Sequence, residues 1–307
     1  MEDYNKIIES LNVHFKQVTD INVTQPITIG NYYDVENSVF RLNSGELRFG
    51  SENTQLSPGE FLFVPGGKYV SITFGSGAPV SLSNDEFISK KENYFQSLRQ
   101  VDVENAVGDS FSYVSFDAKV FDSVNFFASL DIPPFVIPKD RRIENLIMTI
   151  SEERNSMEAG HERLVKLATD QLVVYLIRYI LKQGLFVEQL ATNSTYFKDP
   201  RLIDIFGYIK ENLAGDLSNK KLANVANVSE DYVGQYFKML TGINPQDYIE
   251  YQRMERAVNL LRTTKKSIRE IGTDVGYKDT AYFCRRFKMM FGIPAGKMRR
   301  RESLMNI

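Results

Sequence analysis

The chain has 307 residues, of which 43% are hydrophobic and 25% are charged, and this length predicts two globular domains. One cysteine and two histidines cannot build an internal disulfide or the tetrahedral His/Cys site of a zinc enzyme. The net charge of −2 is unevenly divided: residues 199–307 hold 19 Lys and Arg against 13 Asp and Glu, a net +6, and the rest carries −8. A basic part of this kind suggests a polyanion partner, and a solvated charged face is the alternative.

The most hydrophobic run, residues 172–186, does not predict a membrane span. It is interrupted by Arg178, Lys182 and Gln183, and a span needs about 20 residues without charge. The sequence also lacks the charged and hydrophobic segments of a signal peptide. We therefore expect a cytoplasmic protein that does not contact a membrane.

The first 120 residues predict one helix followed by short strands. Residues 3–17 place hydrophobic side chains at helical spacing and predict an amphipathic helix. Strands are predicted at residues 27–33, 39–42, 46–49, 61–64, 69–74 and 111–116. Asn43, Ser44 and Gly45 predict a hairpin loop with Gly45 at positive φ. This pattern of strands is typical of a sandwich or a small barrel.

Two helices and a linker are predicted next. Residues 140–155 and 162–183 have helical patterns, and the second is hydrophobic on more than one face. Such a helix packs on its own domain with one face and, we expect, on a second copy of the chain with another. The alternative is a helix enclosed within its own domain. Residues 185–198, with the polar run at 192–195, are expected to be a linker.

The remaining chain is predicted to be helical, with clear start signals. Asp199-Pro200 and Asn244-Pro245 each combine a capping side chain with proline at the first helical position. Ser267 and Glu270 fit a capping box.

An internal repeat lies in this region, and its two copies are about 50 residues apart. Residues 221–242 and 268–292 each contain a short helix, a tight turn, a capping residue (Ser229 or Asp279) and a second helix that ends in Phe-Lys-x-x-x-Gly. This is the pattern of a helix-turn-helix, whose second helix enters the major groove of DNA. The predicted inward stripes are Val233, Phe237 and Leu240 in one unit, and Phe283, Phe287 and Phe291 in the other.

The outward residues are the candidate DNA contacts. We expect them to be Asp231, Gly234, Gln235, Lys238, Thr280, Ala281, Cys284, Arg285 and Lys288, joined by Lys297. Arg285 suits a bidentate contact with guanine, or else a phosphate, and Gln235 suits adenine, or else no specific contact. Thr280 and Ala281 suit a thymine methyl group, or are small only to permit close approach.

Other charged residues have sequence-independent roles in this interpretation. Glu230 and Asp231 are expected to cap their helix and to weaken the binding of the first unit to DNA, so that the second unit dominates affinity. The alternative is that they accept a hydrogen bond from the amino group of cytosine. Arg286 is expected to contact phosphate or to form an ion pair at the edge of the core. The remaining phosphate candidates are Lys265, Lys266, Lys297, Arg299, Arg300 and Arg301.

The repeat resembles the DNA-binding domain of the AraC/XylS family of bacterial transcription regulators. The resemblance covers about 100 residues and includes Leu222-Ala223, Phe237-Lys238, residues 242–249, Arg253, Gly276-Tyr277, residues 286–288 and Gly292. Gly272 and residues 293–295 depart from the family pattern. Residues 56–66 look like a turn and strand of the cupin-like β-barrel with which family members sense effectors.

The resemblance implies an α+β protein, with a cupin-like effector-sensing and dimerisation domain at residues 1–184, a linker at 185–198 and a DNA-binding domain at 199–307. It implies double-stranded DNA and a homodimer as partners, RNA polymerase if the protein activates, and no cofactor, metal or catalytic residue. Candidate effector contacts are Arg41, Arg48, Lys68 and Tyr69, with solvent-facing strand positions as the alternative. Lys68 or Tyr69 stands where enzymatic cupins have a metal-binding histidine. The rival functions are an effector-independent dimeric regulator and a cupin enzyme fused to a DNA-binding domain.

Overall fold

The structure, a computed structural model, describes residues 5, 8–9, 11–98, 108–120, 124–129, 132–186, 199–241 and 244–299. The chain divides into two compact units, one rich in sheet and one helical. The described residues of the sheet unit lie within Asn12–Ala118 and Ile132–Leu185, and those of the helical unit lie within Met1–Leu11, Lys119–Asp131 and Phe186–Glu302. Of the predicted linker, residues 187–198 lie outside the described residues.

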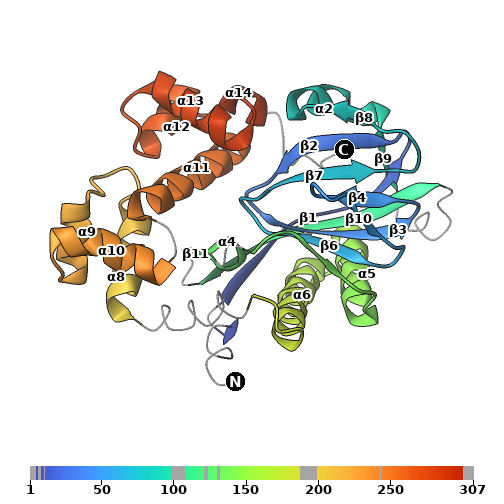
Figure 1. Cartoon of the computed structure of the whole chain (residues 1–307), viewed down its shortest axis with the longest axis horizontal. Coiled ribbons are helices and arrows are strands. Elements are labelled where there is room, and N and C mark those ends of the chain that lie inside the picture. The colour runs from blue at the N-terminus through green and yellow to red at the C-terminus, as the bar shows by residue number, and fades with distance from the viewer. Residues whose placement is uncertain are drawn as a thin grey trace. The chain divides into compact units, whose positions relative to one another are not determined.

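The strands form two sheets (Figure 1). One has the order β12 (Phe135–Ile137), β6 (Phe61–Val64), β3 (Asn37–Ser44), β10 (Asp109–Val120), β1 (Leu11–Val23) and β9 (Phe95–Leu98), and β11 (Val124–Asn125) pairs with β10. The other has the order β5 (Thr54–Leu56), β4 (Leu47–Phe49), β7 (Tyr69–Phe74), β2 (Ile27–Tyr33) and β8 (Val80–Leu82). In the first sheet, β6 is antiparallel to β12 and β3, β10 to β3 and β11, and β1 to β9. In the second sheet, β4 is antiparallel to β5 and β7, β2 is antiparallel to β7, and β2 and β8 are parallel. The predicted bounds of β2, β6 and β7 are confirmed.

The core of the sheet unit is built from buried side chains of both sheets. Phe40 and Phe111 of the first sheet and Tyr32 and Phe74 of the second all belong to one cluster. The rings of Phe74 and Phe111 stack with centroids 4.7 Å apart. The α+β class is therefore confirmed, but the predicted barrel is not closed in the described part of the chain, where each sheet keeps two edge strands.

The predicted helix at residues 3–17 is wrong over its second half, because β1 begins at Leu11. Leu11 and Phe15 have helical spacing, but Leu11, Val13 and Phe15 also follow the two-residue period of a strand. Val18, Ile21 and Val23 extend the run with β-branched side chains, which favour a strand.

The predicted hairpin at residues 43–45 is also wrong. The chain leaves β3 in one sheet and enters β4 in the other, so the turn crosses between sheets. Gly45 does have positive φ, +80°, and a Cβ there would lie 1.8 Å from Oδ1 of Asp109. That carboxylate accepts hydrogen bonds from the backbone of Glu46 and Ser76, at 2.9 and 3.0 Å, and so holds the crossing.

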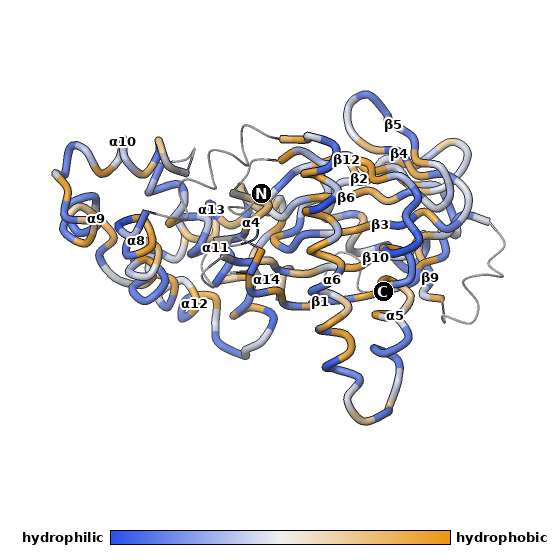
Figure 2. Tube along the Cα trace, turned by 90° about the horizontal axis from the view of Figure 1, so that it is seen from below, coloured by the Kyte–Doolittle hydropathy of each residue, from blue (hydrophilic) through white to orange (hydrophobic). Residues whose placement is uncertain are grey.

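Two long helices complete the sheet unit. α5 (Arg141–Asn155) and α6 (His161–Lys182) pack as a pair, and Figure 2 shows the short loop that joins them. A buried polar contact attaches α5 to the sheet, because Asp20 on β1 accepts hydrogen bonds from Ser112 on β10 at 2.6 Å and from Ser151 on α5 at 2.8 Å. The smaller helices are α2 (Asn84–Lys90), with the short helix Lys91–Asn93 after it, and α4 (Phe126–Ser129) in the Lys119–Asp131 segment of the helical unit.

The helical unit contains both repeats. Its helices are α8 (Pro200–Glu211), α9 (Asn219–Ala226), α10 (Glu230–Thr241), α11 (Pro245–Thr263), α12 (Ile268–Asp274), α13 (Thr280–Phe291) and α14 (Ala295–Met298). Phe206 of α8 packs on Phe237 of α10 and Tyr248 of α11, with ring centroids 5.6 and 5.1 Å away. The capping box of Ser267 and Glu270 is confirmed.

Candidate nucleic-acid interface

The two predicted helix-turn-helix units are present, with α9 and α10 in the first and α12 and α13 in the second. The inward stripes are buried as expected. Val233 and Phe237 in α10, and Phe283, Phe287 and Phe291 in α13, are at most 3% exposed. The side chain of Leu240, the remaining predicted stripe residue, lies outside the described residues. Because one face of α10 and one face of α13 are buried in this way, the opposite face of each helix is left to contact a partner.

The available face of α13 is the better suited of the two to DNA. Ala281, Arg285 and Lys288 are exposed, and Thr280 and Cys284 are half-buried beside them. The first turn carries no acidic residue. Asp279, the predicted cap, accepts a hydrogen bond from the backbone of Tyr282 and orders this turn. This face of α13 therefore carries small side chains in its first turn and basic side chains further along.

The available face of α10 is more acidic. Asp231, Gln235 and Lys238 are exposed and Gly234 is half-buried. Both acidic residues of the first turn, Glu230 and Asp231, are exposed at the end that would enter a groove. Their charges repel phosphate, although the helix N-terminus partly offsets this repulsion. The structure thus places all the candidate contacts of the two helices where the repeat predicts them.

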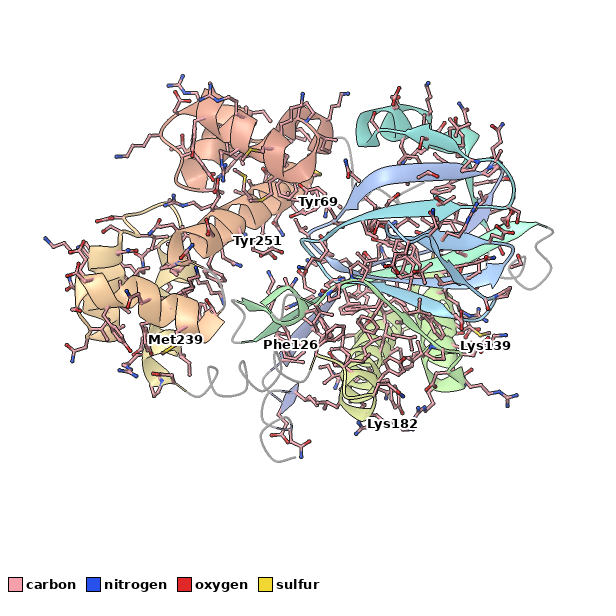
Figure 3. All side chains as sticks on the ribbon, viewed as in Figure 1. Tyr69, Phe126, Lys139, Lys182, Met239 and Tyr251 are labelled. Carbon is pink, nitrogen blue, oxygen red and sulfur yellow. The ribbon has the colours of Figure 1, made fainter. Side chains whose placement is uncertain are left out.

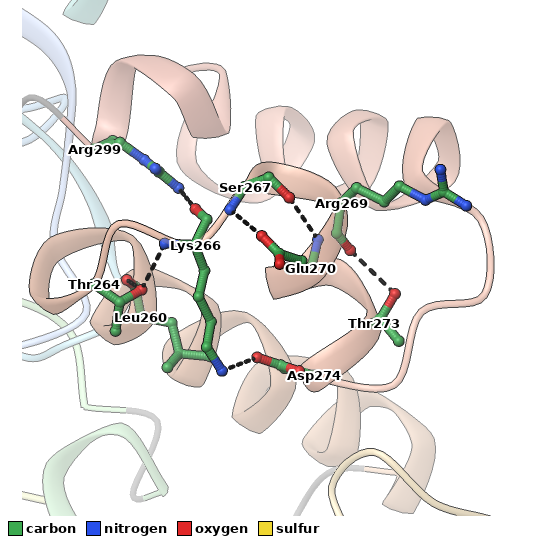
Figure 4. A network of polar contacts seen from close by, with 9 residues as sticks. All are labelled: Leu260, Thr264, Lys266, Ser267, Arg269, Glu270, Thr273, Asp274 and Arg299. Carbon is green, nitrogen blue, oxygen red and sulfur yellow. Dashed lines mark hydrogen bonds and ion pairs between the residues drawn. The ribbon is translucent and has the colours of Figure 1, made fainter.

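Two of the candidate phosphate ligands make contacts within the chain (Figure 4). The ammonium of Lys266 lies 2.7 Å from Oδ2 of Asp274, and the guanidinium of Arg299 donates to the backbone carbonyl of Lys266. Both are surface contacts, which a phosphate can displace at small cost. Lys297 is exposed on α14, whereas Arg300 and Arg301 lie outside the described residues.

Arg286 forms the ion pair that was one of its two predicted roles. Its guanidinium makes two hydrogen bonds to the carboxylate of Glu250 on α11. These bonds raise the pKa of Arg286. The pair fixes α13 against α11, and the sequence pattern did not identify Glu250 as its partner.

Four exposed side chains that lie next to the candidate contacts were not identified from the sequence. Tyr232 and Met239 on α10 are 44% and 58% exposed, and Tyr282 and Met289 on α13 are 47% and 63% exposed. Met239 is labelled on α10 in Figure 3. Each pair is separated by seven residues, and the second pair follows the first by 50 residues. Aligning the two copies of the repeat could have identified these residues, because both helices keep a tyrosine and a methionine at the same outward positions.

The four candidate effector contacts are not brought together inside the sheet unit. Arg41 alternates with the core residues Phe40 and Leu42, and its guanidinium pairs instead with Glu144 on α5. Arg48 alternates in the same way with Leu47 and lies in the other sheet. Lys68 is half-buried before β7, and Tyr69 is 48% exposed, with its ring 4.6 Å from that of Tyr33.

The interior of the sheet unit holds a different polar group, which the sequence did not reveal. The hydroxyl of Ser38 lies 3.2 Å from the hydroxyl of Tyr32 and 3.3 Å from that of Tyr113, and all three residues are fully buried. Burial raises the pKa of Tyr113 to about 12 and raises that of Tyr32 as well. Both tyrosines are therefore neutral hydrogen-bonding groups among hydrophobic neighbours.

Neither a metal centre nor a membrane span is found in the described ranges. No cluster of three or more His, Cys, Asp or Glu side chains that would hold a metal ion occurs among those residues. None of the helices described is long and apolar enough to cross a membrane.

Two helix-turn-helix units in one helical body define a DNA-binding protein, and comparisons with known proteins agree. The model of the helix-turn-helix domain family matches residues 222–301. The chain is 32% identical to the transposon Tn10 TetD protein of Escherichia coli over 37% of this chain and 83% of TetD. It is 28% identical to the transcriptional activator RhaS of an Enterobacter species over 41% of this chain and 43% of RhaS. An uncharacterised regulator of Haemophilus influenzae is 25% identical over 54% of each chain.

The chain belongs to the AraC family of transcription regulators. It matches about half of the length of RhaS and of the Haemophilus regulator. Among solved structures, the fold is similar to that of ToxT from Vibrio cholerae O395, with a TM-score of 0.54 and 11% identity over 97% of this chain and all of ToxT. The similarity to ToxT concerns the fold alone.

Proposed function

We propose that the chain is a cytoplasmic, sequence-specific transcription regulator that reads two neighbouring major-groove segments with α10 and α13. The repeated arrangement carries this proposal: each helix buries an apolar stripe and exposes the face opposite it. In this assignment, residues 1–184 form the effector and dimerisation domain, residues 185–198 the linker and residues 199–307 the DNA-binding domain.

The candidate contacts divide into residues that contact base edges and residues that contact the phosphate backbone. Gln235, Thr280, Ala281, Cys284 and Arg285 face the base edges, with Asp231 and Gly234 at the closest approach of α10. Lys238, Lys288 and Lys297 contact phosphates, which supply affinity without choosing a sequence. The acidic first turn of α10 makes α13 the dominant contributor to affinity.

Selection from random duplex DNA with the full chain tests the proposal. We expect one enriched operator with two half-sites about one helical turn apart. Affinity for that operator should fall as salt rises, by about 0.9 log units per log unit of salt for each phosphate contacted. Failure to enrich any sequence would contradict the proposal.

Control by a small-molecule effector in the sheet unit is the first candidate for regulation. The buried hydroxyls of Tyr32, Ser38 and Tyr113 offer polar groups inside an apolar interior, as ligand sites do. A second candidate, an effector-independent dimeric regulator, is favoured by the aromatic side chains that fill the space between the sheets. Repeating the selection with cell extract separates the two, because only effector control predicts that the extract changes the affinity.

We also propose that α6 joins two copies of the chain, with RNA polymerase as a further partner if the regulator activates. Leu164 and Leu167 on α6 are 46% and 45% exposed although both are large and hydrophobic. Gln171, Val174 and Arg178 continue the same face at spacings of four and three residues, which is the repeat of a helix-helix seam.

Replacing both Leu164 and Leu167 by Asp should convert dimers to monomers, because two carboxylates would be buried without partners in the seam. Analytical ultracentrifugation at micromolar concentration measures this. The matched control is Met157→Asp, since Met157 is fully exposed before α6 and should not affect association. A dimer that survives the double substitution would place the interface elsewhere, and a monomeric native chain would refute dimerisation.

A further inference from the structure

Three segments of the helical unit meet at the side chain of Arg253 on α11. Its Nε donates a hydrogen bond to the carbonyl of Leu213 at 2.9 Å, and its Nη2 donates to the carbonyl of Gly215 at 3.2 Å. Both carbonyls lie in the loop that joins α8 to α9. The guanidinium carbon is also 5.9 Å from the ring centroid of Tyr277, which lies in the turn between α12 and α13.

Gly276 allows this close approach. A Cβ at position 276 would lie 2.7 Å from the carbonyl oxygen of Leu213 and 2.9 Å from the guanidinium carbon of Arg253. The φ of Gly276 is +93°, which side-chain-bearing residues rarely adopt. The turn of the second unit is therefore seated directly on the loop of the first, with Arg253 between them.

The connecting helix does not by itself fix how the two units are turned. α11 sets the distance between its ends, whereas the rotation of each unit about α11 depends on the side-chain contacts that the unit makes. On the first side, the aromatic cluster of Phe206, Phe237 and Tyr248 ties α8 and α10 to α11. On the second side, Glu250 holds Arg286 of α13. The contacts of Arg253 join the first unit to the second directly, in addition to the connection that α11 provides.

We propose that Arg253 is a positioning residue that locks the relative rotation of α10 and α13, so that both enter successive major-groove segments of one operator spacing. The inference rests on the proposed DNA-reading function and adds to it the source of spacing selectivity. A guanidinium suits this position because its planar fork donates to two carbonyls at once, which an ammonium does not do in a fixed geometry. Rigid linkage of two reading heads raises the effective concentration of the second head when the spacing is right.

The test compares operators that differ in spacing. The selected operator and a version with one base pair inserted between the half-sites are titrated with full-length protein. One base pair turns the second half-site by about 35° and moves it by about 3.4 Å, so the native chain should lose about tenfold or more in affinity. Arg253→Gln should bind the native spacing about tenfold more weakly, and its penalty for the insertion should shrink to about threefold or less.

Control variants separate positioning from folding and from charge. Arg256→Gln removes one exposed positive charge from the same helix and should keep the full spacing penalty. Arg253→Lys, which retains the charge without the fork, should shrink the penalty as Arg253→Gln does, and it replaces that variant if thermal melting shows that the glutamine chain is unfolded.

The outcomes distinguish the inference from the proposed function. A native chain that prefers no DNA sequence overturns the proposed function. A native chain that binds its operator but tolerates the insertion, or Arg253 variants that keep the native penalty, overturn the lock while leaving DNA reading intact.

Discussion

Replacing Arg285 by Ala should weaken binding to the selected operator by about 5- to 150-fold, or about 1–3 kcal/mol, and should relax the preference at one base pair. Arg285 is exposed on α13, on the face opposite the buried phenylalanines. Its guanidinium can donate to O6 and N7 of guanine together, and no other base presents those two acceptors in the same place. Competition binding with single-base variants of the operator measures both effects.

Lys297→Ala is the matched control for Arg285→Ala. Lys297 is exposed on α14, and its ammonium is expected to meet phosphate, which carries the same charge at every step. Its loss should weaken binding to all duplexes alike and lower the slope of the salt dependence by about one phosphate. If Arg285→Ala behaves in the same uniform way, Arg285 contacts the backbone and does not read a base.

Replacing Phe287 by Ala should lower the free energy of unfolding of the helical unit by about 3–5 kcal/mol. Phe287 is 0% exposed, and its ring centroid lies 5.7 Å from that of Phe283 and 4.5 Å from that of Phe291. The smaller side chain would leave a cavity in the centre of the stripe that holds α13 in place. Urea unfolding followed by circular dichroism measures the loss, and specific DNA binding should fall with it.

Met289→Ala is the corresponding control on the same helix. Met289 is 63% exposed, so its truncation should change the free energy of unfolding by about 0.5 kcal/mol or less. Equal destabilisation by the two substitutions would show that the stripe of phenylalanines is not the core of the second unit.

Local sequence patterns predicted most elements and misjudged how some of them pair. The runs at β2, β6 and β7 are bounded by turn residues and dense in β-branched and aromatic side chains, so their limits were readable. Residues 11–15 satisfied two periods at once, and they form the first part of a strand whose far end, Asp20–Val23, pairs with the distant β9. Gly45 correctly predicted a turn. The sheet that each flanking strand joins, however, depends on partner strands far along the chain.

The same division holds for the candidate interface. The inward and outward faces of α10 and α13 follow from helical geometry and from the repeat, so the sequence was sufficient to place them. The roles of Glu250 and Arg253 depend on contacts with Arg286, 36 residues away, and with Leu213, 40 residues away. Arg41 was left as a candidate for either the interior or a solvent-facing position, because alternation does not show which side of a strand faces the core until a neighbour such as α5 is in place.

The ratio of two dissociation constants tests most directly whether this chain chooses a DNA sequence. The full-length protein is titrated at physiological salt with its selected operator and with a duplex of the same length and composition in scrambled order. The account predicts that the operator binds about 1,000-fold more tightly or better, as specific sites do. A ratio near one, with both duplexes bound only through their charge, would contradict it.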